Sequence, residues 1–148
     1  MNRACDTSGR LVNLTAATLS LTEATHDGKT ITVNKADGST ITLPAATGSG
    51  ARFRIIVGTT ITSVGLVIKV ANASDVITGS AFWENDTDSS VSAFTAGASD
   101  DTITLNGTTT GGYRGALAVI EDIAANLWHV DVRGAATGTE ATPFSATV

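Results

Sequence analysis

The chain has 148 residues, of which 42% are hydrophobic, and this excludes a disordered chain and allows one domain with its own core. Charged residues make up only 16%, and the net charge is −5. Proteins that bind nucleic acids or anionic membranes need clustered Lys and Arg, whereas the nine basic residues here are scattered. The composition therefore argues against both kinds of partner.

The N-terminal sequence carries no recognisable targeting signal. Residues 1–24 lack the continuous apolar run of a signal peptide, and no run of about 18 apolar residues could cross a bilayer. The single cysteine, Cys5, cannot form a disulfide within the chain. We therefore expect a protein that is made in a cytoplasm and folds without disulfides.

The first forty residues predict an arm followed by strands. Residues 1–10 are polar and irregular, which predicts a flexible N-terminal arm. Residues 19–22 are the first alternating segment, and residues 30–34 and 40–43 are the next two. An Asp-Gly turn separates these last two segments. We therefore expect them to form a β-hairpin.

The tripeptide Thr-Ile-Thr occurs four times, beginning at residues 30, 40, 60 and 102. Alternation places Ile on one face of a strand and Thr on the other, and β-branched residues favour strands. The copies are 10, 20 and 42 residues apart, whereas a repeat array keeps a fixed period. We interpret them as separate strands of one domain and not as coils of a solenoid.

Later segments continue the strand pattern, with small-residue turns between them. Further strands are expected at residues 52–57, 66–70, 76–83, 100–105, 113–121 and 127–133. Residues 84–90 are acidic and polar, and residues 91–98 are ambiguous. Asn106-Gly107 is the strongest turn signal in the chain.

These elements together predict an all-β fold. Eight to ten short strands at a spacing of about 10 residues are typical of a single-domain antiparallel β-sandwich or β-barrel. No segment shows a convincing helical apolar stripe. The domain is expected to span residues 11–133, and residues 134–148 are expected to form an extended C-terminal tail.

The sequence offers little chemistry for catalysis or metal binding. His26 and His129 are far apart, and no phosphate-binding loop or nucleophile elbow is present. Residues 86–90 begin like a calcium loop, but Val91 and Gly97 stand where such a loop needs Gly and Glu. We expect no catalytic residue, cofactor or metal site. A cation trapped between subunits at this acidic loop remains the alternative.

Three aromatic residues are candidates for a surface role. Trp83 ends a predicted strand beside a polar loop and fits either the core or an interface. Trp128 lies within an alternating strand, which favours the core. With Tyr113 they could also form a platform for a carbohydrate, since sugars stack on aromatic faces.

Three segments, taken in order, resemble sequences of bacteriophage virion proteins. They are residues 43–60, which begin Leu-Pro-Ala-Ala-Thr-Gly-Ser-Gly-Ala, residues 102–112, Thr-Ile-Thr-Leu-Asn-Gly-Thr-Thr-Thr-Gly-Gly, and residues 115–130, which end Leu-Trp-His-Val. The set covers about 100 residues and is similar to small head decoration (cement) proteins and to β-rich modules of tail fibres.

The resemblance implies a structural protein on the outer surface of a mature phage capsid, made in the host cytoplasm. It would stabilise the capsid by bridging subunits of the major capsid protein, often as a homotrimer. The two arms have the composition of segments that order on a neighbour. The candidate contact residues at the capsid or between subunits are Arg3, Arg10, Trp83, Tyr113, Pro143 and Phe144.

Two other functions remain open at this point. A tail-fibre or baseplate module would bind a host receptor or glycan, and it would be present in a few copies per particle where a cement protein has hundreds. A glycan hydrolase would need two placed carboxylates in a cleft. The carboxylates available by residue type are Glu84, Glu121, Asp122 and Asp131.

Overall fold

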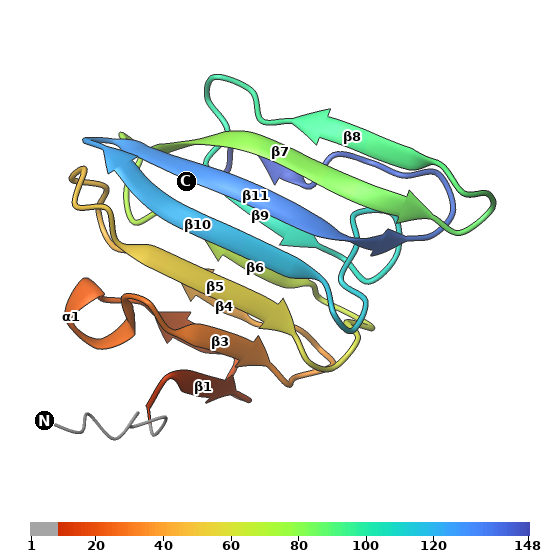
Figure 1. Ribbon diagram of the computed structural model, residues 1–148, viewed down its shortest axis with the longest axis horizontal. Coiled ribbons are helices and arrows are strands. Elements are labelled where there is room, and N and C mark those ends of the chain that lie inside the picture. Colours follow the sequence, from red (N-terminus) through yellow and green to blue (C-terminus); the bar gives the residue numbers. More distant parts are fainter. Residues whose placement is uncertain (1–8) are drawn as a thin grey trace, which may run out of the picture.

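Two stacked β-sheets form the molecule (Figure 1). The computed structural model describes residues 9–148, so Arg3, Cys5 and most of the expected N-terminal arm lie outside the described residues. Within that range there are twelve strands and one four-residue helix, α1 (Glu23–His26). This confirms the predicted all-β fold as a two-sheet sandwich, and neither sheet closes into a barrel.

One sheet has seven strands and the other has five. The seven-stranded sheet, called sheet A, has the spatial order β1 (Leu11–Leu14), β3 (Thr30–Val33), β5 (Arg52–Val57), β10 (Leu117–Ala124), β11 (Leu127–Ala136), β7 (Val76–Asn85) and β8 (Val91–Thr95). The five-stranded sheet, called sheet B, has the order β12 (Phe144–Ser145), β9 (Thr102–Leu105), β6 (Leu66–Lys69), β4 (Thr40–Thr42) and β2 (Thr18–Ser20).

Both sheets are mixed, whereas the sequence suggested antiparallel pairing. The first six strands alternate between the sheets, so that β1, β3 and β5 run parallel in sheet A. In the same way β2, β4 and β6 run parallel in sheet B. Residues 11–70 therefore make stacked coils, and the copies of Thr-Ile-Thr at residues 30 and 40 lie in this solenoid-like half, contrary to our interpretation of them.

The coils escaped detection because their loops differ in length. Leu11 aligns with Thr30, and Thr30 aligns with Arg54, so successive positions in sheet A are 19 and 24 residues apart. Only one coil carries the Thr-Ile-Thr tripeptide twice, in β3 and β4. A test for a fixed period cannot detect coils of this kind.

The predicted hairpin of residues 30–34 and 40–43 does not form. Strand β3 pairs with β1 and β5, whereas β4 pairs with β2 and β6 in the other sheet. Ile31 and Ile41 are both completely buried, because each sheet presents its Ile to the shared interior. The residues between the two strands cross from one layer to the other, a separation of about 10 Å in face-to-face sheets.

Several other elements differ from the sequence-based expectation. The copy of Thr-Ile-Thr at residue 60 is not a strand, although Ile61 is buried and its N–H bonds to Gly112 O (2.9 Å). The ambiguous segment after residue 90 forms β8, and β10 continues to Ala124 through a shift in register after Asp122.

The C-terminal segment belongs to the sandwich and is not an extended tail. Strand β11 continues to Ala136, and β12 pairs with β9. The Asp101 carboxylate accepts hydrogen bonds from the N–H groups of Thr147 (2.8 Å) and Val148 (3.2 Å). The folded domain therefore reaches the last residue, beyond the predicted boundary at Arg133.

The core lies between the sheets and consists mainly of branched aliphatic and aromatic side chains. Trp128 packs against Phe53 with ring centroids 5.9 Å apart. Both rings are completely buried, as Trp128 was expected to be. The Ile residues of β3, β4 and β9 join them, which is the role that the alternating pattern assigns to the Ile face.

A buried carboxylate, Asp122, holds the loop of residues 44–51 against β10. Its oxygens accept hydrogen bonds from the N–H groups of Thr47 (2.9 Å), Gly48 (2.7 Å) and Ser49 (3.1 Å). The hydroxyls of Thr47 and Ser49 also donate to it. Burial alone would raise the pKa of Asp122, but these donors outweigh burial and lower the pKa below its ordinary value.

We expect Asp122→Ala to lower the free energy of unfolding by about 3 kcal/mol, because it removes a buried carboxylate that accepts hydrogen bonds from three backbone N–H groups. Chemical denaturation measures this change. Asp86→Ala is the control, since Asp86 is exposed, and it should change the free energy by less than about 0.5 kcal/mol. Equal effects of the two substitutions would contradict the assigned role of Asp122.

We expect acid to destabilise the fold through Asp122 and Asp101. Burial opposes ionisation of Asp101 as well, but hydrogen bonds from Thr147, Thr102 and Val148 lower its pKa. A carboxyl whose pKa is lower in the folded state stabilises the fold above its unfolded pKa, and this contribution disappears as the pH falls through the folded value. The free energy of unfolding should therefore decline below about pH 4. Asp122→Asn should show a shallower decline.

Candidate interaction surface

The outer face of sheet A is a broad surface of the described chain that no second layer covers (Figure 1). Side chains that alternate with the core residues point outward from each strand and line up across the sheet. By register, one such row consists of Asn13, Thr32, Ile56, Leu117, Arg133, Phe82 and Ala93. This face therefore mixes apolar and charged side chains instead of presenting hydroxyl groups alone.

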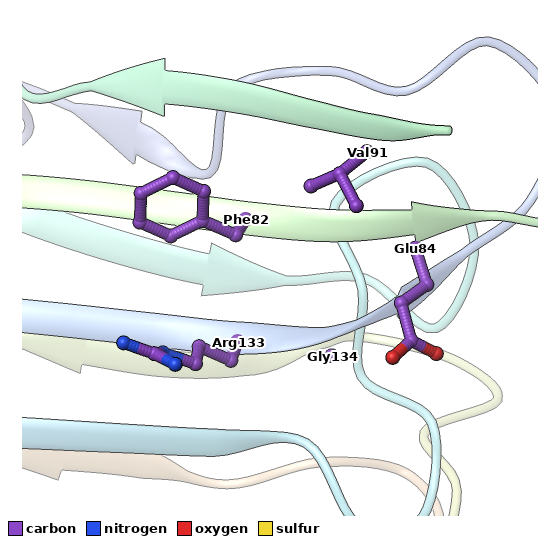
Figure 2. Close-up of a pocket in the computed structure, with 5 residues that line it drawn as sticks. All are labelled: Phe82, Glu84, Val91, Arg133 and Gly134. Carbon is purple, nitrogen blue, oxygen red and sulfur yellow. The ribbon is translucent and has the colours of Figure 1, made fainter. Parts of the chain in front are cut away.

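Two exposed apolar side chains of this face, Phe82 and Val91, lie where β7, β8 and β11 meet. We call this site the Phe82 patch, and it consists of Phe82, Glu84, Val91, Arg133 and Gly134 (Figure 2). Phe82 is 38% exposed and Val91 is 58% exposed. The patch forms a shallow hollow of about 310 Å³. In Figure 2 the Arg133 guanidinium and the Glu84 carboxylate lie on either side of Gly134.

The Arg133 side chain is held in place over the Phe82 ring. Its Cζ lies 5.9 Å from the ring centroid, within the range of a cation–π contact. Its Nε and Nη2 atoms donate to Asp131 Oδ1 (3.1 Å) and Oδ2 (3.0 Å). This paired hydrogen bond, with the charge of Asp131, raises the pKa of Arg133. The Arg133 charge is therefore paired with Asp131 while the guanidinium lies over the Phe82 ring.

Trp83 lies on the inner side of the same strand and supports the patch from below. It is completely buried, and its Nε1 donates to Ala141 O (3.0 Å). A Cβ atom on Gly111 would lie only 2.8 Å from the Trp83 ring, and one on Gly134 would lie 2.9 Å from Ala116 Cβ. The Trp83 ring of β7 therefore contacts three other parts of the chain. These are the loop that precedes β10, strand β11 and the C-terminal segment.

The predicted contact residues do not gather at one place. Trp83 is part of the core, and Pro143 and Phe144 are also buried, so none of the three presents its side chain at the surface. Arg10 is exposed immediately before β1, and Arg3 lies outside the described residues.

Among the predicted contact residues in the described chain, Tyr113 is the one that adjoins the Phe82 patch at the surface. It lines a neighbouring hollow together with Glu84, Arg114 and Arg133. Its hydroxyl donates to Thr137 Oγ1 (3.2 Å). The ring is half-buried, so part of it remains available to a partner.

Sequence reasoning missed the residues that form the patch itself, and one signal for them was present. Phe82 and Trp83 are neighbours on a strand, so their side chains must face opposite sides of the sheet. If Trp83 had been assigned to the core, the alternation would have predicted Phe82 on the outer face. Val91 carried no such signal, because the segment that contains it showed no clear alternation.

The four carboxylates considered for hydrolysis do not share one location. Asp122 points into the protein and is occupied by its loop, while Asp131 pairs with Arg133. Glu121 lies opposite His129, and Glu84 lies opposite Ala135, in different rows of the sheet. Glu121 and Asp131 are diagonal neighbours on the outer face of β10 and β11, but Asp131 is already paired with Arg133.

His26 and the acidic loop serve local structure. His26 Nδ1 accepts a hydrogen bond from Thr22 N–H (3.0 Å) at the start of α1, and Asp88 accepts one from Ser90 N–H (2.8 Å). Within residues 9–148, no group of three or more His, Cys, Asp or Glu side chains could hold a metal ion. The same residues contain no helix that is long and apolar enough to cross a membrane.

No protein-family model and no curated protein matches this sequence. The site must therefore be interpreted from its own chemistry. An aromatic ring with a stacked arginine, next to an exposed valine and a carboxylate, is suited to protein recognition, since interface cores are rich in aromatic residues and Arg. The shallow, open shape of the hollow fits a protein surface better than a small molecule.

We expect Trp83→Phe to lower the free energy of unfolding by about 2 kcal/mol, because it removes ring volume and the bond to Ala141 O. Phe82→Leu is a matched control on the outer side of the same strand and should cost less than about 1 kcal/mol. Thermal and chemical unfolding of both variants measure the difference. A larger effect at Phe82 would contradict this assignment of inner and outer faces.

Proposed function

We propose that this protein is a structural component of a bacteriophage particle that binds the outer surface of the mature capsid. It would stabilise the shell by bridging subunits of the major capsid protein, after synthesis in the host cytoplasm. The Phe82 patch, on the open face of sheet A, is the observation that carries the proposal, because it supplies an apolar centre with charges at its rim.

Two further features support this function. The three segments that resemble phage virion proteins span both sheets, and the first of them contains the loop that Asp122 holds. The fold is also tied together at several distant points, including the C-terminal residues at Asp101. A protein that reinforces a pressurised shell benefits from such resistance to local unfolding.

The stabilisation would come from selective binding to one state of the capsid. A ligand that binds the mature shell but not its disassembled subunits shifts the equilibrium toward the shell. Weak contacts repeated over a symmetric lattice add up through avidity, and association of the protein into homotrimers would increase this effect. The Phe82 patch can therefore act with modest affinity per copy.

We expect purified protein to bind isolated mature heads and to raise the temperature at which they release DNA. Phe82→Asp should weaken binding at least tenfold, because it places a charge in the apolar centre of the patch. Val64→Asp is the control, since Val64 is 89% exposed and does not belong to the patch. Co-sedimentation with heads measures binding, and light scattering measures the expected homotrimer.

The alternative function predicts a different result in the same experiment. A tail-fibre or baseplate module would not bind mature heads and would bind host cells or their surface glycans. Wild-type protein that fails to sediment with heads but binds host cells would overturn the capsid proposal. Equal binding by wild type and Phe82→Asp would show that another surface makes the contact.

A further inference from the structure

Strand β8 is the last strand of sheet A, and one of its two sides has no strand beside it in the described part of the chain. Two backbone hydrogen bonds flank its ladder with β7, from Ala96 N–H to Gly79 O (3.0 Å) and from Asn85 N–H to Ser90 O (3.2 Å). In an antiparallel ladder, hydrogen-bonded pairs alternate with pairs that do not exchange bonds. These two bonds therefore determine which groups of β8 face β7.

The alternation assigns the groups of β8 to its two sides. Ser92 and Phe94 exchange hydrogen bonds with β7. The N–H and C=O groups of Val91, Ala93 and Thr95 consequently point away from β7, and no backbone partner within residues 9–148 bonds to them. The outer side of β8 thus offers an ordered row of donors and acceptors.

This edge lacks the features by which proteins usually block strand addition. Lysine, proline, bulges and very short strands are the common protections. The five residues of β8, Val-Ser-Ala-Phe-Thr, carry no charge and no proline, and their register with β7 is unbroken. The edge strands of sheet B, in contrast, have three residues in β2 and two in β12. Sheet B is therefore protected by short edges, and β8 is not.

We propose that β8 is the docking edge for a second copy of this chain, through antiparallel pairing of the two β8 strands about Ala93. In that register Ala93 lies opposite the partner's Ala93, and Val91 lies opposite the partner's Thr95. Each copy would donate the three free N–H groups of Val91, Ala93 and Thr95 and accept three from the partner. The two seven-stranded sheets would join into one continuous sheet.

The chemistry of the strand favours a second copy over an unrelated chain. Because β8 is uncharged, self-pairing brings no like charges together across the new ladder, although the chain as a whole carries −5. The small Ala93 side chains meet on the outer face, where bulk would hinder close approach. Val91, which is 58% exposed in one copy, would gain the partner's Thr95 as a neighbour in the pair.

The pairing would also unite the two Phe82 patches. Phe82 lies opposite Ala93 in the β7–β8 register, so the row through Phe82 would continue through both Ala93 residues to the partner's Phe82. A two-fold axis perpendicular to the sheet keeps both patches on the same face. This contact joins copies two at a time, so in the proposed homotrimer it would link one trimer to the next.

The first test compares molar masses by light scattering and sedimentation over a range of concentrations. Wild-type protein should reach twice the mass of Ala93→Lys, in which two ammonium groups would meet at the centre of the contact. Ala93→Ser is the matched control, since it keeps the strand neutral and small, and it should behave like wild type. Equal masses of wild type and Ala93→Lys at every concentration would overturn the proposal.

A second test separates the backbone contact from side-chain effects. Ala93→Pro removes an N–H group that points away from β7, so the fold should persist while pairing is lost. Should this variant not fold, hydrogen exchange of the wild type gives the same information, because the amides of Ala93 and Thr95 should exchange more slowly as concentration rises. Exchange at these amides that does not depend on concentration would contradict the pairing.

A cross-link tests the register directly. In a Cys5→Ser background, Ala93→Cys should form a disulfide-linked dimer under mild oxidation, because opposed residues bring their Cα atoms to about 5.5 Å. Val64→Cys, more exposed and away from β8, should cross-link far more slowly. Equal rates at the two positions would reject pairing about Ala93. None of these measurements uses capsids, so a negative result would leave the proposed function standing.

Discussion

The Asp122 carboxylate is the interaction on which the arrangement of the two halves of the chain depends. It lies in β10, and it holds a loop some 73 to 75 residues earlier in the sequence through three backbone N–H groups. That loop leads directly into β5, the strand at which the parallel coils meet the antiparallel strands. Because a shift of this loop would take these donors away from a buried carboxylate, it would carry an energetic cost.

The outer face of sheet A follows from this junction. Once β5 is aligned with β10, the registers of β10 with β11 and of β11 with β7 place Arg133 beside Phe82. Trp83 then supports the strand from the inner side against Gly111 and Gly134, where a larger residue would collide. The Phe82 patch is therefore held by the core beneath it, and this would suit the proposed contact, which needs a surface that does not rearrange.

The same sheet carries both proposed contacts, the patch for the capsid and the β8 edge for a second copy. Their closeness means that one row of side chains, Arg133, Phe82 and Ala93, runs from one contact to the other. Occupation of the edge would bring two patches onto one surface, which increases avidity for a repeating lattice. Sheet B has only short edge strands and carries neither proposed contact, so its role is to complete the core.

The sequence by itself determined the all-β class and most of the core. The alternation around Ile31, Ile41 and Ile103 indicates, from neighbouring residues alone, which side chains face inward. It could not determine that Ile31 and Ile41 belong to different sheets, because a turn of this length can either reverse a strand or cross between layers. The place of Trp83 and the exposure of Phe82 likewise depended on strands that are distant in sequence. Periodicity is a local property of the chain, whereas strand pairing and the choice of exposed face are decided by contacts between residues far apart, and only the tertiary structure contains those contacts.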